Sequence, residues 1–285
     1  MTGFTISVCN VDHDKMKKKI TSLTWFEKWF LYFEVIWGRT LTRWMDIEKG
    51  YRMNRSSCRN IFDSKLSIVI SCRSSWPQFA SYMEDSFLRK SKWNDKYKGK
   101  RVVMWDDTNI DFQFKPGGAD EQRMTYSSYY GGNVGKGGVF LQLCGWLGVE
   151  HLWVGATSDT YYQEKSGIFK NQEEYAKNDL IDEHVIPFHN IFDKGYRVNL
   201  MAWRQGRQEV EQPVFARSDR KFTGMETLKS ASIATDRSGN ERAVKMAKMS
   251  GPLARGLSCT GCPKRLDNIW LAWSFQCNFM FKPIL

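Results

Sequence analysis

The stretch Val102-Val103-Met104-Trp105-Asp106-Asp107-Thr108-Asn109 decides the fold, because an apolar run ends there in two neighbouring carboxylates. A short run of large apolar residues bounded by polar ones is typical of a strand buried inside a sheet. A carboxylate that directly follows such a strand lies at the mouth of the sheet, where ligands commonly bind. The stretch therefore predicts a buried strand that ends at Asp106.

The rest of this half of the chain repeats strand-like and helix-like patterns. A second apolar run, Val185 to Phe192, ends at Asp193 in the same way. Strands interleaved with helices indicate an α/β domain. The other expected elements are a strand over 110–114, a mobile Gly-, Ser- and Tyr-rich loop over 115–137, strands over 139–145 and 152–156 around a turn at Gly148, a helix over 172–182 and a packing helix over 266–281.

A third acid, Glu241, is predicted to open a helix. Lys245 and Lys248 follow it at i+4 and i+7 and therefore share its face, where they could contact DNA phosphate. The ordinary alternative is a capping box, in which Ser238 and Glu241 only satisfy the backbone groups at the helix start.

Asp106, Asp193 and Glu241 together predict a metal-dependent phosphodiester chemistry. Such a trio can hold two divalent cations roughly 3.5–4 Å apart, and carboxylate oxygens are the ligands that Mg²⁺ or Mn²⁺ prefers. Asp106 and Asp193 could instead be ordinary turn residues. Asp159 also follows an apolar run and is a rival for the second acid, although the cap of the next helix is the favoured interpretation of that position.

The first third of the chain carries most of the positive charge. Residues 1–100 hold 19 Lys/Arg against 10 Asp/Glu, a net +9, whereas residues 101–285 hold 23 against 21, a net +2. A basic module joined to a nearly neutral one indicates a polyanion-binding region, and nucleic acid is the favoured partner. Residues 86–100 have little apolar periodicity and are expected to form the linker between the two.

Residues 41–66 of this basic third have the pattern of a helix-turn-helix. A helix over 41–51 and a second over 56–66 flank a short polar break, and Asn54 or Ser56 can cap the second helix. The first turn of the second helix would enter the major groove, so the candidate contacts are Arg55, Ser57, Arg59 and Asn60. The alternative is an ordinary helical hairpin with a solvated polar face. An amphipathic helix from Trp25 to Trp37 precedes the motif.

The cysteine content indicates a reducing compartment. Seven cysteines are an odd number and are scattered along the chain, which favours free thiols inside a cell over a disulfide framework. No run of 18–20 apolar residues predicts a membrane span. With DNA as the partner, we expect an intracellular protein of the nucleus.

With these residues in place, the chain resembles the DDE-superfamily transposases of the Harbinger type, most strongly over residues 101–285. In that family the first acid lies in an Asp-Gly-Thr-like motif, the second in an Asp-x-Gly-Tyr motif, and the third is a helical Glu followed two turns later by Lys. The segments that carry the resemblance here are Trp105-Asp-Asp-Thr108, Gly155-Ala-Thr-Ser-Asp159, Phe192-Asp-Lys-Gly-Tyr196, and Glu241 with Lys248. Asp107 stands where the family usually has a small residue.

The resemblance implies a ribonuclease-H-like nuclease domain over 101–285, with catalytic and metal-binding roles for Asp106, Asp193 and Glu241. It also implies a helical DNA-binding region over 1–100, double-stranded DNA as substrate, and two Mg²⁺ or Mn²⁺ ions. A homo-oligomer and an accessory DNA-binding protein are partners that the family also uses. The expected activity is cutting and joining of DNA at transposon ends. The alternatives are a catalytically silent, domesticated relative that binds DNA or protein, and a repair or restriction nuclease.

Overall fold

The structure is a computed structural model that describes residues 23–38, 44–112, 118–193, 196, 202, 208–215, 220–254 and 263–281. Its centre is a mixed sheet built around β1 (Arg101–Asp111), which pairs antiparallel with β3 (Gly132–Gln142) and parallel with β6 (Phe188–Ile191). β7 (Glu209–Glu211) extends the sheet in parallel beyond β6. On the far side of β3 lie β2 (Tyr126–Ser127), β4 (Leu147–Val149) and β5 (Trp153–Val154).

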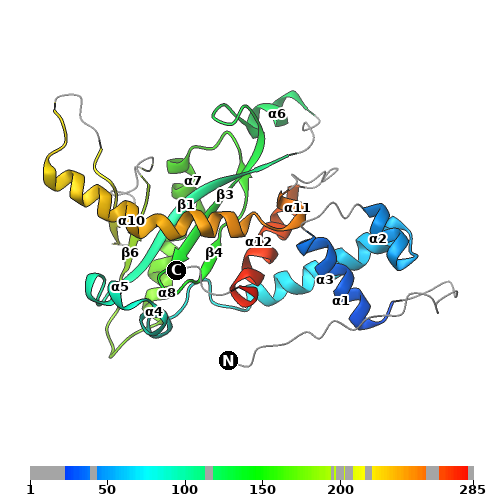
Figure 1. Cartoon of the computed structure of the whole chain (residues 1–285), viewed down its shortest axis with the longest axis horizontal. Coiled ribbons are helices and arrows are strands. Elements are labelled where there is room, and N and C mark those ends of the chain that lie inside the picture. The colour runs from blue at the N-terminus through cyan, green and yellow to red at the C-terminus, as the bar shows by residue number, and fades with distance from the viewer. Residues whose placement is uncertain are drawn as a thin grey trace.

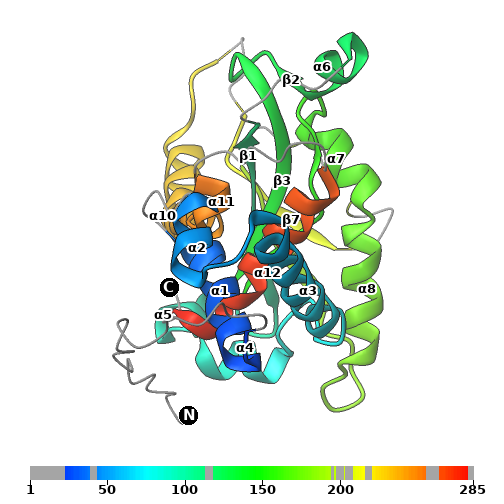
Figure 2. The ribbon, with the colours of Figure 1, turned by 90° about the vertical axis from the view of Figure 1, so that its right-hand side faces the viewer.

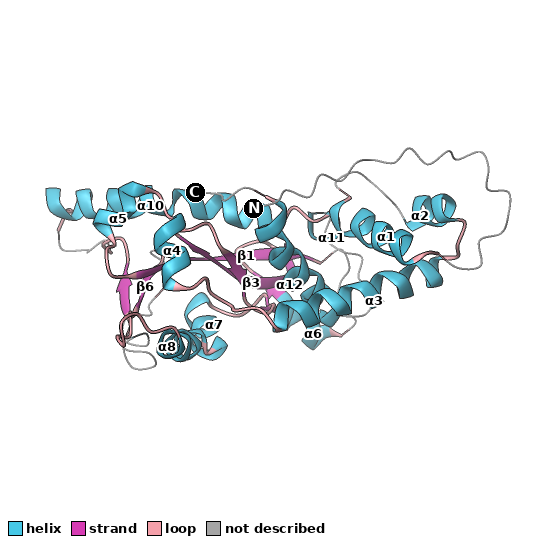
Figure 3. Ribbon diagram, turned by 90° about the horizontal axis from the view of Figure 1, so that it is seen from below, coloured by secondary structure: helices cyan, strands magenta, loops and turns pink. Residues whose placement is uncertain are grey.

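Helices cover both faces of this sheet, so the expected α/β class is confirmed. α10 (Gly224–Ala247) and α12 (Pro263–Met280) lie on one face, whereas α7 (Asp159–Ser166) and α8 (Ile168–Asn178) lie on the other (Figure 3). Figure 2 shows the same separation of α10 from α8. A mixed, curled sheet with flanking helices is compatible with a ribonuclease-H-like fold.

The alternation of side chains along β1 assigns its residues to two separate cores. Val102 and Met104 belong to the cluster that contains Ala243 of α10 and Trp270 of α12. Val103 and Trp105 belong to the cluster that contains Ile168 and Phe169 of α8. The indole of Trp105 donates a hydrogen bond to Asn190 (2.7 Å), which satisfies its polar atom inside that core. Consecutive residues of β1 therefore face different helical layers.

Three helices form one end of the molecule, next to α12 (Figure 1). They are α1 (Trp25–Trp37), α2 (Trp44–Tyr51) and α3 (Arg55–Ser74). α1 is apolar on almost every side: Leu31, Tyr32 and Ile36 are buried, whereas Trp25 is 69% exposed. Tyr32 stacks on Phe62 of α3 with ring centroids 5.4 Å apart. Residues from α1, α3, α12 and β1 belong to one hydrophobic cluster, so these helices share their core with the sheet.

The expected linker over 86–100 is wrong. This segment contains the end of α4 (Tyr82–Leu88) and all of α5 (Ser91–Lys96). Trp93 and Tyr97 are almost completely buried. Both donate to the carboxylate of Asp236 on α10, through the Trp93 indole at 3.3 Å and the Tyr97 hydroxyl at 2.8 Å. The segment is therefore not a linker. Its two buried aromatic residues pack against α10, and its polar residues lie around that contact.

The loop expected over 115–137 is also wrong where the structure describes it. α6 (Ala119–Thr125) and β2 occupy the first part, and β3 begins at Gly132. The turn expected at Gly148 lies instead at Gly145, whose φ of +90° favours glycine. Gly148 belongs to β4, where the ring of Phe140 crosses so closely that a Cβ atom would lie 1.9 Å from it. The expected packing helix at the C-terminal end is confirmed as α12.

No helix among the residues that the structure describes is long and apolar enough to cross a membrane.

Candidate active site

The register between β1 and β6 determines where the first two acids lie. The last parallel partners are Met104 and Ile191, and Asp106 and Asp193 each follow two residues later. Both carboxylates therefore emerge at the same edge, where β6 has ended. The expectation that the first strand also ends at Asp106 is wrong, because β1 continues to Asp111 in its pairing with β3, with Asp106 opposite Val139.

Glu241 lies in the interior of α10 rather than at a helix start. The helix begins at Gly224, where Thr223 and Glu226 form the capping box, with a hydrogen bond of 3.2 Å from the Glu226 amide to the Thr223 hydroxyl. The alternative capping role of Ser238 and Glu241 is therefore wrong. Ala243 is fully buried and seats this part of α10 on the sheet, whereas Glu241 is exposed.

Arg237, which the sequence interpretation missed, joins the first two acids. Its guanidinium lies 2.9 Å from the Asp193 carboxylate and 3.7 Å from that of Asp106. The Arg237 side chain is only 15% exposed. Arg237 precedes Glu241 by one helical turn, and the i, i+4 spacing is the sequence signal that could have placed both on one face.

The pKa of Asp106 reports that the three acids share one electrostatic environment. Burial is the largest effect and raises this pKa above its usual value. The guanidinium of Arg237 and the backbone N–H of Asp107 lower it, whereas the negative charges of Asp193 and Glu241 raise it further. The structure therefore joins Asp106 and Asp193 through Arg237, and Glu241 lies within range for its charge to act on Asp106.

Asp107 faces the opposite layer of the sheet. Its carboxylate oxygens are buried, and burial, together with the negative charge of Asp159, raises its pKa to about 8. Asp159 accepts a charged hydrogen bond from Lys136, and Ser158 caps α7 by accepting from the Tyr161 amide (3.2 Å). The favoured role of this segment as a helix cap is confirmed. Of the two neighbouring carboxylates of β1, Asp106 is the one on the side of α10.

The donor set around Asp106 fits a hard divalent cation. It consists of carboxylates, which suit Mg²⁺ or Mn²⁺. Within the described ranges, no group of three or more His, Cys, Asp or Glu side chains is already arranged around a common ion position. Arg237 supplies the positive charge next to Asp106 and Asp193 in this structure. A cation on these carboxylates would compete with that guanidinium.

The predicted helix-turn-helix segment forms two helices joined by residues 52–54. α3 begins at Arg55, with Asn54 as its cap: the Asn54 side chain accepts from the Ser57 amide at 2.8 Å. Arg55 and Asn60 are exposed, and Arg55 pairs with Glu48 at 3.0 Å. Arg59 packs over the ring of Trp44 at 5.5 Å, so its guanidinium is partly withdrawn from solvent. α3 is longer than expected and runs to Ser74.

Lys245 and Lys248 lie at the C-terminal end of α10. Lys245 is exposed and Lys248 is the half-buried C-cap residue. They follow Glu241 by one and two turns, as the sequence predicted for one helix face. This end of α10 therefore continues from the acids as a positively charged surface.

No protein-family model, no curated protein and no solved structure matches this chain. The assignment of a function therefore depends on the residues and geometry of the chain itself.

Replacing Arg237 with Gln is expected to tighten Mn²⁺ binding by about threefold to tenfold. The variant removes a positive charge 2.9 Å from Asp193 and 3.7 Å from Asp106. The expected gain is kept small because solvent screens the carboxylate of Asp193, which is 53% exposed. Isothermal titration calorimetry with Mn²⁺ measures the change. Arg242→Gln is the matched control on an exposed position of α10. Weaker binding by Arg237→Gln than by the control would mean that Arg237 supports the ion rather than competing with it.

Proposed function

We propose that the protein is a metal-dependent DNA endonuclease and strand-transfer enzyme of the DDE type. The observation that carries the proposal is the common position of Asp106 and Asp193, two residues beyond the last paired residues of β1 and β6, with Glu241 within electrostatic range of Asp106. Phosphoryl transfer requires positioning and charge neutralisation more than covalent chemistry from the protein. Cations held by a cluster of carboxylates at a sheet edge would meet that requirement.

The residues of the cluster would divide this work between them. Asp106, half-buried on the rigid centre of the sheet, would fix the position of the cations, and Asp193 and Glu241 would complete their oxygen ligands. Two bound Mg²⁺ or Mn²⁺ ions would supply an activated water or DNA 3′-hydroxyl and stabilise the leaving oxygen. Arg237, once released from the carboxylates, and Lys245 with Lys248 would hold DNA phosphates along α10.

Two experiments test this proposal. A crystal soaked in Mn²⁺ should give anomalous scattering between Asp106 and Asp193, with Glu241 within reach. Purified protein with Mn²⁺ should nick or cut double-stranded DNA, and EDTA should prevent this. Strand joining in the same reaction would separate a transposase from a repair or restriction nuclease. An absence of both manganese and cleavage would remove the enzymatic proposal.

The DNA-binding part of the proposal uses the exposed start of α3. Arg55, Ser57, Arg59 and Asn60 occupy its first turns, and helix-turn-helix proteins place that part of the second helix in the major groove. Arg55 and Asn60 are the more accessible of the four. We therefore propose double-stranded DNA as the partner of this face, in a nuclear protein. A homo-oligomer and an accessory DNA-binding protein remain part of the proposal through the resemblance alone.

Replacing Arg55 with Ala is expected to weaken duplex DNA binding and to reduce the slope of log K against log salt by about 0.9, the contribution of one phosphate contact. Fluorescence anisotropy over a series of salt concentrations measures the slope. Lys177→Ala is the matched control, because Lys177 forms a comparable surface ion pair with Glu173 on α8. An equal slope in wild type and Arg55→Ala would count against this face.

A silent relative is the second candidate function, and Arg237 is the observation that favours it. The guanidinium offsets part of the negative charge of Asp106 and Asp193 without any ion, as a protein that retained the carboxylates only for stability would require. Such a protein would still bind DNA through α3. It would give no metal-dependent cleavage and no manganese signal in the experiments above.

A further inference from the structure

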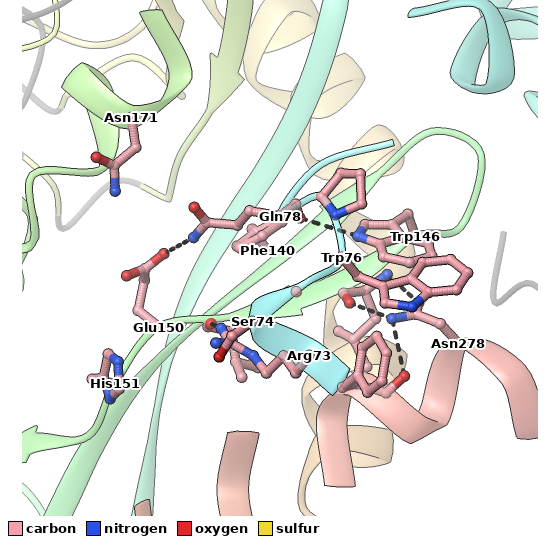
Figure 4. A pocket seen from close by; sticks show the side chains of 15 residues that line it. Arg73, Ser74, Trp76, Gln78, Phe140, Trp146, Glu150, His151, Asn171 and Asn278 are labelled. Carbon is pink, nitrogen blue, oxygen red and sulfur yellow. Dashed lines mark hydrogen bonds between the residues drawn. The ribbon is translucent and has the colours of Figure 1, made fainter. Parts of the chain in front are cut away.

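A pocket of about 290 Å³ lies where the end of α3 meets β4 and α12 (Figure 4). None of Asp106, Asp193, Glu241 or Arg237 lines it, so it is separate from the candidate active site. Its volume is at the lower end of the range for small-molecule sites. That size suits a ligand of one or two rings.

The walls on one side of the pocket are aromatic. Trp76 and Trp146 line it together (Figure 4), and both contact Phe279 of α12, with ring centroids at 5.2 and 6.3 Å. The indole of Trp146 is held by a hydrogen bond to the Gln78 carbonyl (3.1 Å). Trp76 is 51% exposed although it is the largest type of side chain. An exposed indole beside a fixed one is a surface on which a planar ring can stack.

The opposite side of the pocket presents a buried carboxylate. Glu150 is 8% exposed, and one of its oxygens accepts a hydrogen bond from the Gln78 amide. Burial raises the pKa of Glu150, and the positive charge of Arg73 acts against this shift. A carboxyl group keeps the capacity to accept hydrogen bonds whether it is ionised or protonated. This side therefore favours a ligand edge that carries N–H donors.

Arg73 provides a positive charge between the two sides (Figure 4). Its guanidinium donates to the Val149 carbonyl at 3.2 Å, and a guanidinium has five N–H donors in total. The donors beyond that contact can serve an anionic group such as a phosphate. The pocket thus combines an aromatic surface for stacking, a carboxyl group that accepts hydrogen bonds from N–H groups, and a guanidinium that can bind an anionic group.

We propose that this pocket binds a single unstacked nucleotide whose base carries an exocyclic amino group. The ring would lie against Trp76, the amino group would donate to Glu150, and the phosphate would meet Arg73. Cytosine, adenine and guanine offer the required amino donor, whereas thymine offers carbonyl oxygens at the equivalent positions. Unstacked bases are bound in this way, by stacking on aromatic side chains and by hydrogen bonds to the base edge.

The test is a binding measurement with the full chain at pH 8 in EDTA, so that no metal-dependent reaction contributes. Tryptophan fluorescence is titrated with dCMP, TMP, oligo(dC) and oligo(dT). We expect cytosine to bind about tenfold more tightly than thymine, in keeping with one good hydrogen-bonded contact. Binding of dCMP itself would identify free nucleotides as the source of the ligand, and binding of oligo(dC) alone would identify a nucleic-acid strand.

Variants make the test specific to the pocket. Glu150→Gln is expected to remove the preference for cytosine, whereas Glu173→Gln, the same change at a partly exposed position of α8 outside the pocket lining, should retain it. Trp76→Ala changes an exposed residue and is expected to weaken both ligands. Equal binding of cytosine and thymine by the wild type, or a preference that survives in Glu150→Gln, would overturn the proposal. Either result is independent of whether the protein cleaves DNA.

Discussion

Replacing Asp106 with Asn is expected to lower the rate of metal-dependent DNA cleavage by about a thousandfold. The substitution retains the shape of the side chain and removes its charge, and loss of several kcal/mol of charge stabilisation in the transition state corresponds to about this factor. The effect should be larger than at Asp193, because Asp106 is held on the central strand and is 27% exposed, whereas Asp193 is 53% exposed. Single-turnover cleavage of a labelled duplex in Mn²⁺ measures the rate.

Asp107→Asn is the matched control for this prediction. Asp107 is the next residue of β1 but faces the layer of α7, beside Asp159 and Lys136. Its pKa of about 8 means that the carboxyl is largely protonated at pH 7, so the amide removes little charge there. Cleavage by Asp107→Asn should stay within a few fold of wild type. If Asp107→Asn were inactive and Asp106→Asn active, the assignment of the two acids would have to be exchanged.

The positions of Asp106 and Asp193 after apolar runs could be read from the sequence, but the contact that joins them could not. Asp106 and Asp193 follow apolar runs, and that pattern located the strands β1 and β6. Their common edge depends on the pairing of Met104 with Ile191, which no local pattern specifies. The contacts of Arg237 could not be predicted either, because its guanidinium meets one carboxylate within β1 and another beyond the end of β6. Side-chain spacing within α10 indicates only that Arg237 and Glu241 share a face.

The Gly-rich segment before Val139 shows why the sequence predicts a loop, rather than a strand, for the first half of β3. Glycine is usually unfavourable in strands, and the segment contains several. In the structure, however, Gly137 lies under Trp270 of α12, and Gly138 lies under Tyr162 of α7. A Cβ atom at either position would be 2.9 Å from the Trp270 ring or 2.5 Å from the Tyr162 hydroxyl. The requirement for glycine comes from helices that pack on the strand from both faces.

A regular spacing of buried residues begins at Asp85 and runs through the segment over 86–100 that was expected to be a linker. Asp85, Arg89, Trp93 and Tyr97 recur at intervals of four, and all four are buried. The first two are charged, so a search for apolar periodicity does not recognise them. Asp85 and Arg89 can be buried because their opposite charges pair with each other. The composition of this segment therefore gave the wrong prediction, and the pair of Asp85 with Arg89 explains why.

Replacing Asp85 with Ala is expected to lower the free energy of unfolding by about 3–5 kcal/mol, the usual cost of leaving one partner of a buried ion pair alone. Asp85 lies 2.8 Å from Arg89, and both side chains are only 1% exposed. The other Asp85 oxygen accepts from the Cys144 amide (2.9 Å), two residues beyond the end of β3. The substitution therefore leaves a buried guanidinium without its counter-charge and separates α4 from the sheet. Urea denaturation measures the change.

The double variant Asp85→Ala with Arg89→Met distinguishes an unpaired charge from a loss of packing. Arg89 also donates to the carbonyl groups of Tyr97 and Lys100, each at 3.2 Å, so those neutral contacts are lost as well. If the unpaired charge causes most of the cost, the double variant should be more stable than Asp85→Ala alone. Glu173→Ala breaks an exposed i, i+4 pair on α8 and should cost no more than about 0.5 kcal/mol. A double variant less stable than Asp85→Ala would instead assign the cost to the hydrogen bonds that Arg89 makes with the two carbonyl groups that follow α5.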